Sequence, residues 1–200
     1  NQYDRRIRSA DDVARTTETP IVGTLPLEKS LVNAESRLSP DQLTARDARR
    51  RSATRHLDEA LRELRTNVDF LDVDQPPRSI VVTSALPGDG KSTVAANLAV
   101  VMAETGRTVI LIDCDLRKPT VARTFGVPGE IGLSDVLAGR IELKAAIQRW
   151  AEHAELFILP SGSVPPNPSE LLGSEALRDL ISAFTAEGAT VILDAPPLLP

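Results

Sequence analysis

Four short, mostly apolar runs recur along this chain of 200 residues. They cover residues 80–84, 108–112, 156–159 and 190–193, and they lack the strict alternation of a strand that faces water on one side. Residues 80–84 have strand character, and the other three runs are typical of parallel strands buried on both faces. We therefore expect a parallel sheet that is covered by helices.

Between these runs the apolar spacing becomes helical. An amphipathic helix is expected over residues 56–71, where apolar side chains recur at intervals of three and four. Its apolar positions are Leu57, Leu61, Leu64, Val68 and Leu71. Further helices are expected at residues 91–105, 132–139, 143–150 and 169–186. The alternation of strands and helices predicts an α/β fold with a doubly wound, mostly parallel sheet.

Residues 1–54 lack such a pattern and are expected to form an extended arm, which leaves residues 55–200 as the folded domain. A short helix is expected before Pro20, an extended piece at residues 20–26 and a mobile linker at residues 28–54. The cluster of Arg5, Arg6 and Arg8 fits either a solvated terminus or a positive patch beside the cytoplasmic side of a membrane.

Composition narrows the function classes. The net charge of −5 argues against general binding to nucleic acid. Cys114 is the only cysteine, so no intramolecular disulfide can form and a reducing compartment is favoured. At a strand end this thiol is expected to be a small packing residue. The sequence contains no apolar run of 18 residues, so none of it is expected to span a membrane.

The loop after the first run carries the main chemical motif. Residues 84–93 read Ser-Ala-Leu-Pro-Gly-Asp-Gly-Lys-Ser-Thr and lead into the expected helix at residues 91–105. Backbone N–H groups in such a loop, together with the start of a helix, bind phosphates. Lys91 is expected to reach the β- and γ-phosphates, and the Ser92 hydroxyl to ligate Mg²⁺.

This loop departs from the strict pattern G-x-x-x-x-G-K-[ST] at one position, because Ala85 stands where the first glycine should be. Alone, the motif also fits a glycine-containing turn with a solvated lysine. The residues expected to bind the nucleotide are Ala85, Pro87, Gly88, Asp89, Gly90, Lys91, Ser92 and Thr93.

Acidic residues follow two of the later runs. Asp113 and Asp115 come after residues 108–112, and Asp194 comes after residues 190–193. A helix of about 14 residues and the strand after it cover similar lengths in opposite directions, so Asp113 returns to the level of the phosphate loop. A carboxylate pair beside Mg-nucleotide can hold the metal through water or accept a proton from an attacking hydroxyl. Either job is open to Asp113 and Asp115, so these two are candidate catalytic residues with Lys91, while Ser92 and Asp194 are expected to hold Mg²⁺. Alone, acids at strand ends also fit helix caps or solvated loop residues.

Two further groups of charges leave alternatives open. Glu59, Arg62 and Arg65 lie off the apolar stripe of their helix, where they suit either solvated intrahelical pairs or contacts with another subunit. Arg117, in a basic loop after Asp115, fits either a contact with phosphate or an acidic partner, or an ordinary surface arginine.

Together, these segments resemble the bacterial tyrosine kinases that regulate capsule and exopolysaccharide synthesis, within the larger group of division-site and chromosome-partitioning P-loop ATPases. The matching segments are residues 84–93, 109–119, 132–137, 165–172 and 191–197. In that family a residue other than glycine at the position of Ala85 is usual. The resemblance implies an ATP- and Mg²⁺-dependent kinase in which Lys91 and Ser92 bind phosphate and metal, Asp113 and Asp194 complete the metal site, and Asp115 helps to activate the tyrosine hydroxyl.

The resemblance also implies partners. It matches Glu59, Arg62 and Arg65 to the family's E-x-x-R-x-x-R helix, which joins subunits into a ring. The arm resembles the stretch after the second transmembrane helix of the fused membrane form, which implies a location at the cytoplasmic face of the bacterial inner membrane beside a chain-length-regulator segment. Family members continue past residue 197 with another strand, helices and a tyrosine-rich tail, so an incomplete domain is expected. Their substrates are proteins that contain tyrosine.

Two other functions compete with the kinase. A spatial-organisation ATPase of the MinD/ParA kind would hydrolyse ATP with water, but its relatives usually carry an additional lysine early in the phosphate loop, and no lysine lies between Ser79 and Gly90. A non-enzymatic module that senses nucleotide could instead regulate polysaccharide chain length through its oligomeric state.

Overall fold

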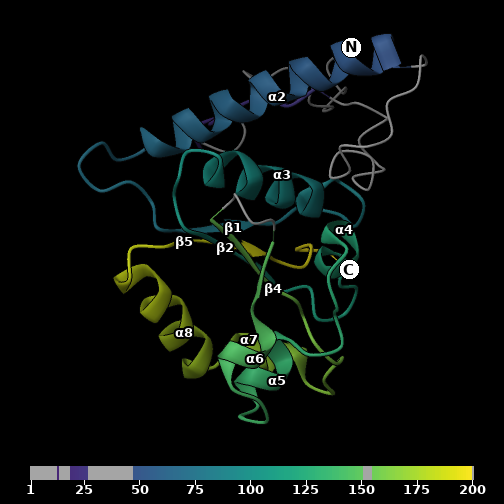
Figure 1. Cartoon of the computed structure of the whole chain (residues 1–200), viewed down its shortest axis with the longest axis vertical. Coiled ribbons are helices and arrows are strands. Elements are labelled where there is room, and N and C mark those ends of the chain that lie inside the picture. Colours follow the sequence, from purple (N-terminus) through teal and green to yellow (C-terminus); the bar gives the residue numbers. More distant parts are fainter. Residues whose placement is uncertain (1–12, 14–18, 27–46, 151–154, 200) are drawn as a thin grey trace, which may run out of the picture.

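Five strands form one sheet in the computed structural model, which describes residues 13, 19–26, 47–150 and 155–199 (Figure 1). The strand order is β1-β5-β2-β4-β3. The strands are β1 (Ser79–Val82), β2 (Val109–Asp113), β3 (Gln148–Arg149), β4 (Leu156–Leu159) and β5 (Thr190–Asp194). All neighbours pair in parallel except β3 and β4, which are antiparallel. The expected α/β fold with a mostly parallel sheet is confirmed.

Helices cover both faces of this sheet (Figure 1). They are α2 (Asp47–Asp69), α3 (Lys91–Ala103), α4 (Val121–Phe125), α5 (Leu133–Leu137), α6 (Leu143–Ala146), α7 (Pro168–Leu172) and α8 (Glu175–Ala186). In Figure 1, α3 lies on one face with α2 across its outer side, whereas α5 to α8 lie beyond the other face.

The core is divided by the sheet into two apolar clusters, as the alternating direction of side chains along a strand requires. Val109 and Leu111 of β2 join the cluster under α2 and α3, whereas Ile110 and Ile112 join the cluster under α8. Every residue of β2 and β5 is buried. The continuous apolar runs at residues 108–112 and 190–193 therefore reflect strands with no solvent-facing side, whereas the edge strand β1 leaves Val81 exposed.

The register of the central strands positions the site. Asp113 at the end of β2 pairs with Asp194 at the end of β5, and Asp194 pairs in turn with Val82 of β1. Because these strands are parallel, their carboxyl ends meet at one edge, beside the loop that joins β1 to α3.

The amphipathic helix expected over residues 56–71 is longer at its start, because α2 begins at Asp47 and crosses the boundary expected at residue 54. Leu57 and Leu61 are buried against the layer below. Near its end, Asp69 receives a bidentate ion pair from Arg107, with N···O distances of 2.6 and 2.8 Å. This contact ties α2 to the segment that enters β2.

Two expected helices were wrong in extent. The helix expected at residues 143–150 ends at Ala146, because Gln148 and Arg149 pair with β4 and the Trp150 ring packs edge-on against Phe125. The helix expected at residues 169–186 is two helices, α7 and α8. The Ser174 hydroxyl caps α8 by accepting a hydrogen bond from the Leu177 amide at 3.4 Å.

Part of the arm lies on the domain. Residues 19–26 contain no helix or strand, as expected for the extended piece, and Val22 and Leu25 pack against the cluster under α2. Asn67 of α2 donates a hydrogen bond to the Val22 carbonyl at 2.7 Å. The expectations for Arg5, Arg6 and Arg8 and for residues 28–46 of the linker fall outside the described residues. Residues 47–54 of the expected linker lie in α2, so that part of the expectation was wrong. No helix in the described part of the chain has the length and hydropathy needed to cross a bilayer.

Candidate active site

The phosphate loop takes the shape that its glycines permit. Gly88 and Gly90 have φ values of 88° and 94°, in the left-handed region where a side chain is strained. Asp89 closes the loop by accepting a hydrogen bond from the Leu86 amide at 2.9 Å. α3 then begins directly at Lys91, so the free N–H groups of its first turn face the loop.

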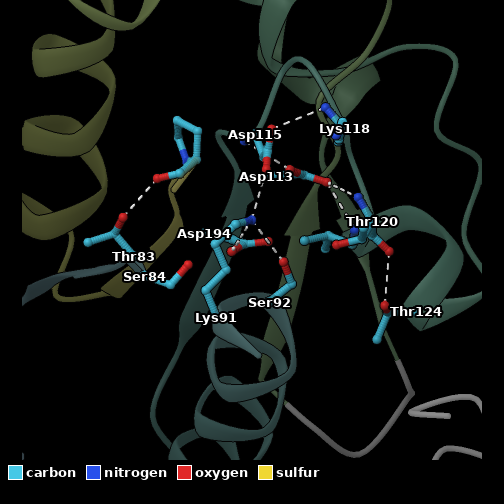
Figure 2. Close-up of polar contacts among 12 residues, drawn as sticks. Thr83, Ser84, Lys91, Ser92, Asp113, Asp115, Lys118, Thr120, Thr124 and Asp194 are labelled. Atoms are coloured by element: carbon cyan, nitrogen blue, oxygen red, sulfur yellow. Dashed lines mark hydrogen bonds and ion pairs between the residues drawn. The ribbon is translucent and has the colours of Figure 1, made fainter. Parts of the chain in front are cut away.

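Lys91 lies at the centre of the charged cluster (Figure 2). Its ammonium nitrogen is 2.9 Å from Asp115 Oδ2 and 3.5 Å from Asp194 Oδ1, and it also lies 3.1 Å from the Ser92 hydroxyl. Burial alone would lower the pKa of Lys91, but its hydrogen bonds with Asp115 and Asp194 and their negative charges raise that pKa overall. The lysine is therefore a cation that two carboxylates hold in place.

The two carboxylate oxygens of Asp194 have different surroundings. Its side chain is fully buried, and Oδ2 has no hydrogen-bond partner among the described residues. Burial raises the pKa of Asp194, although the hydrogen bond with Ser92 and the charge of Lys91 oppose this effect. Burial of a carboxylate oxygen without a hydrogen-bond partner costs free energy. A cation, or a water molecule bound to a cation, would supply the missing interaction.

Asp113 and Asp115 use their carboxylates differently. Asp113 accepts three backbone hydrogen bonds, from the Asp115 amide at 3.1 Å and from the Thr120 and Val121 amides at 3.0 Å. Asp115 accepts one from the Lys118 amide at 3.1 Å and turns its other oxygen to Lys91. Asp113 thus organises the loop that follows β2, whereas Asp115 faces Lys91.

Cys114 between them is a packing residue, as the sequence indicated. The thiol is buried, and its burial, together with the charges of Asp113 and Asp194, raises its pKa far above the usual range. It stays protonated at neutral pH.

These residues open onto one cavity of about 810 Å³. Seven of the eight residues expected to bind nucleotide line it, along with Asp115 and the exposed Arg117 and Lys118. Those seven are Pro87, Gly88, Asp89, Gly90, Lys91, Ser92 and Thr93, whereas Ala85 does not appear in the lining. The volume is in the range of small-molecule sites.

Some walls of this cavity were not expected from the sequence. Leu25 and Pro26 of the arm and Leu57 and Leu61 of α2 form an apolar wall, and Thr120 contributes a polar one. The segment after β5 forms another wall, since the Leu198 amide donates to the Ser84 carbonyl at 2.9 Å. The sequence did not indicate these contacts, because segments far apart in the chain bring the residues to the loop.

The donor atoms suit Mg²⁺ better than a metal bound by protein alone. Within the described ranges, no three His, Cys, Asp or Glu side chains are grouped to hold a metal. Ser92, Asp113 and Asp194 belong to one cluster of polar side chains (Figure 2). Mg²⁺ is typically held by one or two carboxylates plus phosphates and water. The residues present fit such an ion only together with a nucleotide.

The three charges of the expected interface helix are placed differently. Glu59 and Arg62 are exposed on α2, whereas Arg65 is half-buried and donates a hydrogen bond to the Val101 carbonyl of α3 at 3.1 Å. Only the first two are presented fully to solvent in this chain.

Comparison with known proteins agrees with this geometry. A family model described as ParA, NUBPL iron-transfer P-loop NTPase, matches residues 75–141. Tyrosine-protein kinase YwqD of Bacillus subtilis (strain 168) is 47% identical over 141 residues, which are 70% of this chain and 59% of that protein. The chain spans between 19% and 59% of the length of the first curated relatives that it matches.

Solved structures extend the match along the chain. The kinase domain of the Escherichia coli tyrosine kinase ETK superposes with a TM-score of 0.78 at 30% identity, covering 95% of this chain and 74% of that domain. The septum site-determining protein MinD from Pyrococcus horikoshii, complexed with Mg-ADP, has a TM-score of 0.52 at 32% identity and covers 62% of this chain and 51% of that one. The identity and coverage against the kinase domain, together with the Lys91, Asp115 and Asp194 cluster, show that this chain belongs to the family of bacterial tyrosine kinases within the P-loop NTPases.

Proposed function

We propose that this chain is the nucleotide-binding core of an ATP-dependent protein-tyrosine kinase that regulates the polymerisation and export of capsular or extracellular polysaccharide. The observation that carries the proposal is the position of the Lys91 ammonium, 2.9 Å from Asp115 and 3.5 Å from Asp194 beside the phosphate loop. Family membership supports the polysaccharide role and a location at the cytoplasmic face of the inner membrane.

In this proposal the loop from Ala85 to Thr93 binds the ATP phosphates, and Lys91 exchanges its contact with Asp115 for the β- and γ-phosphates. Ser92, Asp194 and Asp113 hold Mg²⁺ directly or through water, and the ion supplies neutralisation of phosphate charge when it is bound. The MinD relative complexed with Mg-ADP supports this assignment.

The release of Lys91 leaves Asp115 free to act as a base. The tyrosine oxygen forms a bond to the terminal phosphorus while the bond to ADP breaks, and the phenolic proton passes to Asp115. Because Asp115 is held by the Lys118 amide, its oxygen stays oriented after the lysine moves. Positioning and charge neutralisation, rather than covalent chemistry by the protein, then account for the rate.

The test is transfer by the full-length protein with Mg-ATP, compared with its Lys91→Met variant. Phosphotyrosine is scored by mass spectrometry and free phosphate is measured in the same tube. Removal of the Lys91 charge should abolish transfer and leave the fold intact. Lys144→Met is the matched control, because Lys144 is exposed on α6 and does not line the cavity.

Other outcomes would assign a different function. Phosphotyrosine formation by Lys91→Met would overturn the site assignment. Free phosphate without phosphotyrosine would favour an ATPase of the MinD kind, which the fold similarity to MinD keeps as the second candidate. The absence of both products would favour a nucleotide-sensing module.

A further inference from the structure

Thr120 carries a hydroxyl that this structure does not use. The residue lies directly before α4, and its Oγ1 is buried without a hydrogen-bond partner among the described residues. Asp194 Oδ2 is the other buried side-chain oxygen there in the same condition. Both residues belong to the one cluster drawn in Figure 2.

The position of Thr120 makes this lack of a partner unusual. Threonine before the first turn of a helix commonly accepts a hydrogen bond from that turn, but the Thr120 side chain makes no such bond. Asp113 Oδ2 instead accepts hydrogen bonds from the backbone amides of Thr120 and Val121. The backbone of Thr120 is therefore fixed by Asp113 while its hydroxyl remains unused.

The surroundings indicate what the hydroxyl serves. Thr120 lines the same cavity as Lys91, Ser92 and Asp115. It follows the same strand as Asp115, on the side of the cluster where Lys118 lies, whereas Thr83 lies on the opposite side (Figure 2). In a phosphate-loop site the loop amides cradle the inner phosphates, and the terminal phosphoryl group faces the acidic strand ends.

We propose that the Thr120 hydroxyl is a positioning group for the substrate, donating a hydrogen bond to an oxygen of the terminal phosphoryl group of ATP. The inference rests on the proposed nucleotide site and assigns one of its polar contacts. A buried hydroxyl without a partner costs free energy, and a phosphate oxygen that accepts its proton recovers that cost only when ATP is bound. ADP lacks the terminal group, so the hydroxyl distinguishes the two nucleotides.

The experiment compares Thr120→Val with the wild type in the full-length protein. Valine has nearly the same shape, and the backbone amide that Asp113 holds is retained. Binding of ADP and of a non-hydrolysable ATP analogue is measured by titration calorimetry with Mg²⁺, and the melting temperature is measured without nucleotide. We expect the analogue to bind about tenfold more weakly and ADP to bind unchanged, the loss typical of a hydrogen bond to a charged group.

The melting temperature separates this role from a structural one. Because the hydroxyl makes no bond in the nucleotide-free chain, Thr120→Val should melt at or above the temperature of the wild type. Thr120→Ser should restore binding of the analogue. Thr124→Val is the matched control, since Thr124 does not line the cavity and its hydroxyl bonds the Thr120 carbonyl at 2.9 Å; it should leave the ratio of the two affinities unchanged.

Three results would overturn the inference: wild-type affinity for the analogue in Thr120→Val, equal weakening for ADP and the analogue, or a lower melting temperature without nucleotide. Each is independent of the kinase assay. If Thr120→Val loses affinity only for the analogue in a protein that forms no phosphotyrosine, the Thr120 contact stands and the kinase assignment is rejected. If the protein forms phosphotyrosine and Thr120→Val binds both nucleotides as the wild type does, the kinase assignment stands and the Thr120 contact is rejected.

Discussion

Asp113 combines a buried charge with an extensive set of backbone contacts. Its side chain is fully buried, and its two oxygens hold the amides of Asp115, Thr120 and Val121. Burial raises the pKa of Asp113 from 3.8 to about 6, and the charge of Asp194 adds to the increase against the effect of the three amides. Folding therefore favours the protonated, neutral form of the Asp113 side chain over its charged form, relative to the unfolded chain.

This pKa predicts the pH dependence of stability. A carboxyl with a higher pKa in the folded state than in the unfolded chain binds its proton more tightly when folded, so stability falls as pH rises from about 4 to about 6 and changes no further above that range. The contribution of Asp113 should be about 3 kcal/mol. Urea unfolding of wild type and Asp113→Asn between pH 4 and 7, with EDTA and without nucleotide, checks it.

The difference between the two proteins isolates Asp113 from the other acids. The wild type should lose more stability across this range than Asp113→Asn, which has no charge to gain at that position. Curves that stay parallel from pH 4 to 7 would contradict the prediction. Loss of one backbone contact in the asparagine variant lowers its whole curve without changing the slope.

At the residue scale, the sequence could predict which side chains gather but not how each one is used. Lys91 and Asp194 follow from motif and strand ends, because parallel strands bring their carboxyl ends together. The division between Asp113, which holds backbone, and Asp115, which holds Lys91, depends on the path of residues 114–121. Two aspartates two positions apart look equivalent in the sequence, and only that loop distinguishes them.

At the scale of secondary structure, helix α2 both packs on the domain and presents charged side chains to solvent. Its apolar face packs on α3, and its outer face presents Glu59 and Arg62 to solvent. Arg65 belongs to the packed side, because its guanidinium bonds the Val101 carbonyl of α3. Of the three charged residues in the proposed subunit interface, Arg65 therefore already makes a hydrogen bond within its own chain.

Substitution of the two arginines should separate these two roles of α2. Arg62→Ala should weaken assembly of the full-length protein with little change in melting temperature, since Arg62 is exposed. Arg65→Ala should also lower the free energy of unfolding by about 1 kcal/mol, because it removes the bond to Val101. Sedimentation velocity and thermal unfolding measure the two effects, with Lys144→Ala as the exposed control.

Unchanged sedimentation of both arginine variants would reject the interface. Assembly lost only in Arg65→Ala, together with stability, would instead show that α2 must be held on α3 before subunits can join. A fall in melting temperature for Arg62→Ala would contradict its exposed position.

Elements were predictable from the sequence in proportion to the strength of their pattern. Strands β2 and β5 are buried along their whole length, so every position in the sequence reports the same environment. The two-residue strand β3 has no pattern of its own, and its antiparallel pairing with β4 overrides the helical tendency of residues 143–150. The extension of α2 back to Asp47 was missed because that part is polar and carries no apolar stripe.

Over the whole molecule, the strand order converts three separate sequence motifs into one site. β5 lies between β1 and β2, although it comes last in the chain. Asp194 is therefore placed between the phosphate loop after β1 and the acidic loop after β2, and it can contact Lys91. The sequence indicated a parallel sheet with three converging ends, but the central position of the last strand is a property of the tertiary fold.

Because the parts of the site come from all three strands, nucleotide binding should stabilise the entire fold. A ligand that binds only the folded state, at about 100 times its Kd, adds about 2.7 kcal/mol to the free energy of unfolding. For a domain of this size we expect the melting temperature to rise by about 5 to 10 °C with Mg-ATP. EDTA removes Mg²⁺ and should therefore remove much of this increase in melting temperature, because the buried charge of Asp194 then has no metal ion beside it.

The Ser92→Ala variant tests whether this increase depends on the proposed metal contact. It lacks the hydroxyl beside Lys91 and Asp194 but keeps the loop amides, so it should retain the part of the increase seen with ATP in EDTA and lose the part that Mg²⁺ adds. Ser182→Ala, exposed on α8, should behave as the wild type. A full Mg²⁺-dependent increase in Ser92→Ala would mean that the carboxylates and phosphates hold the ion without this serine.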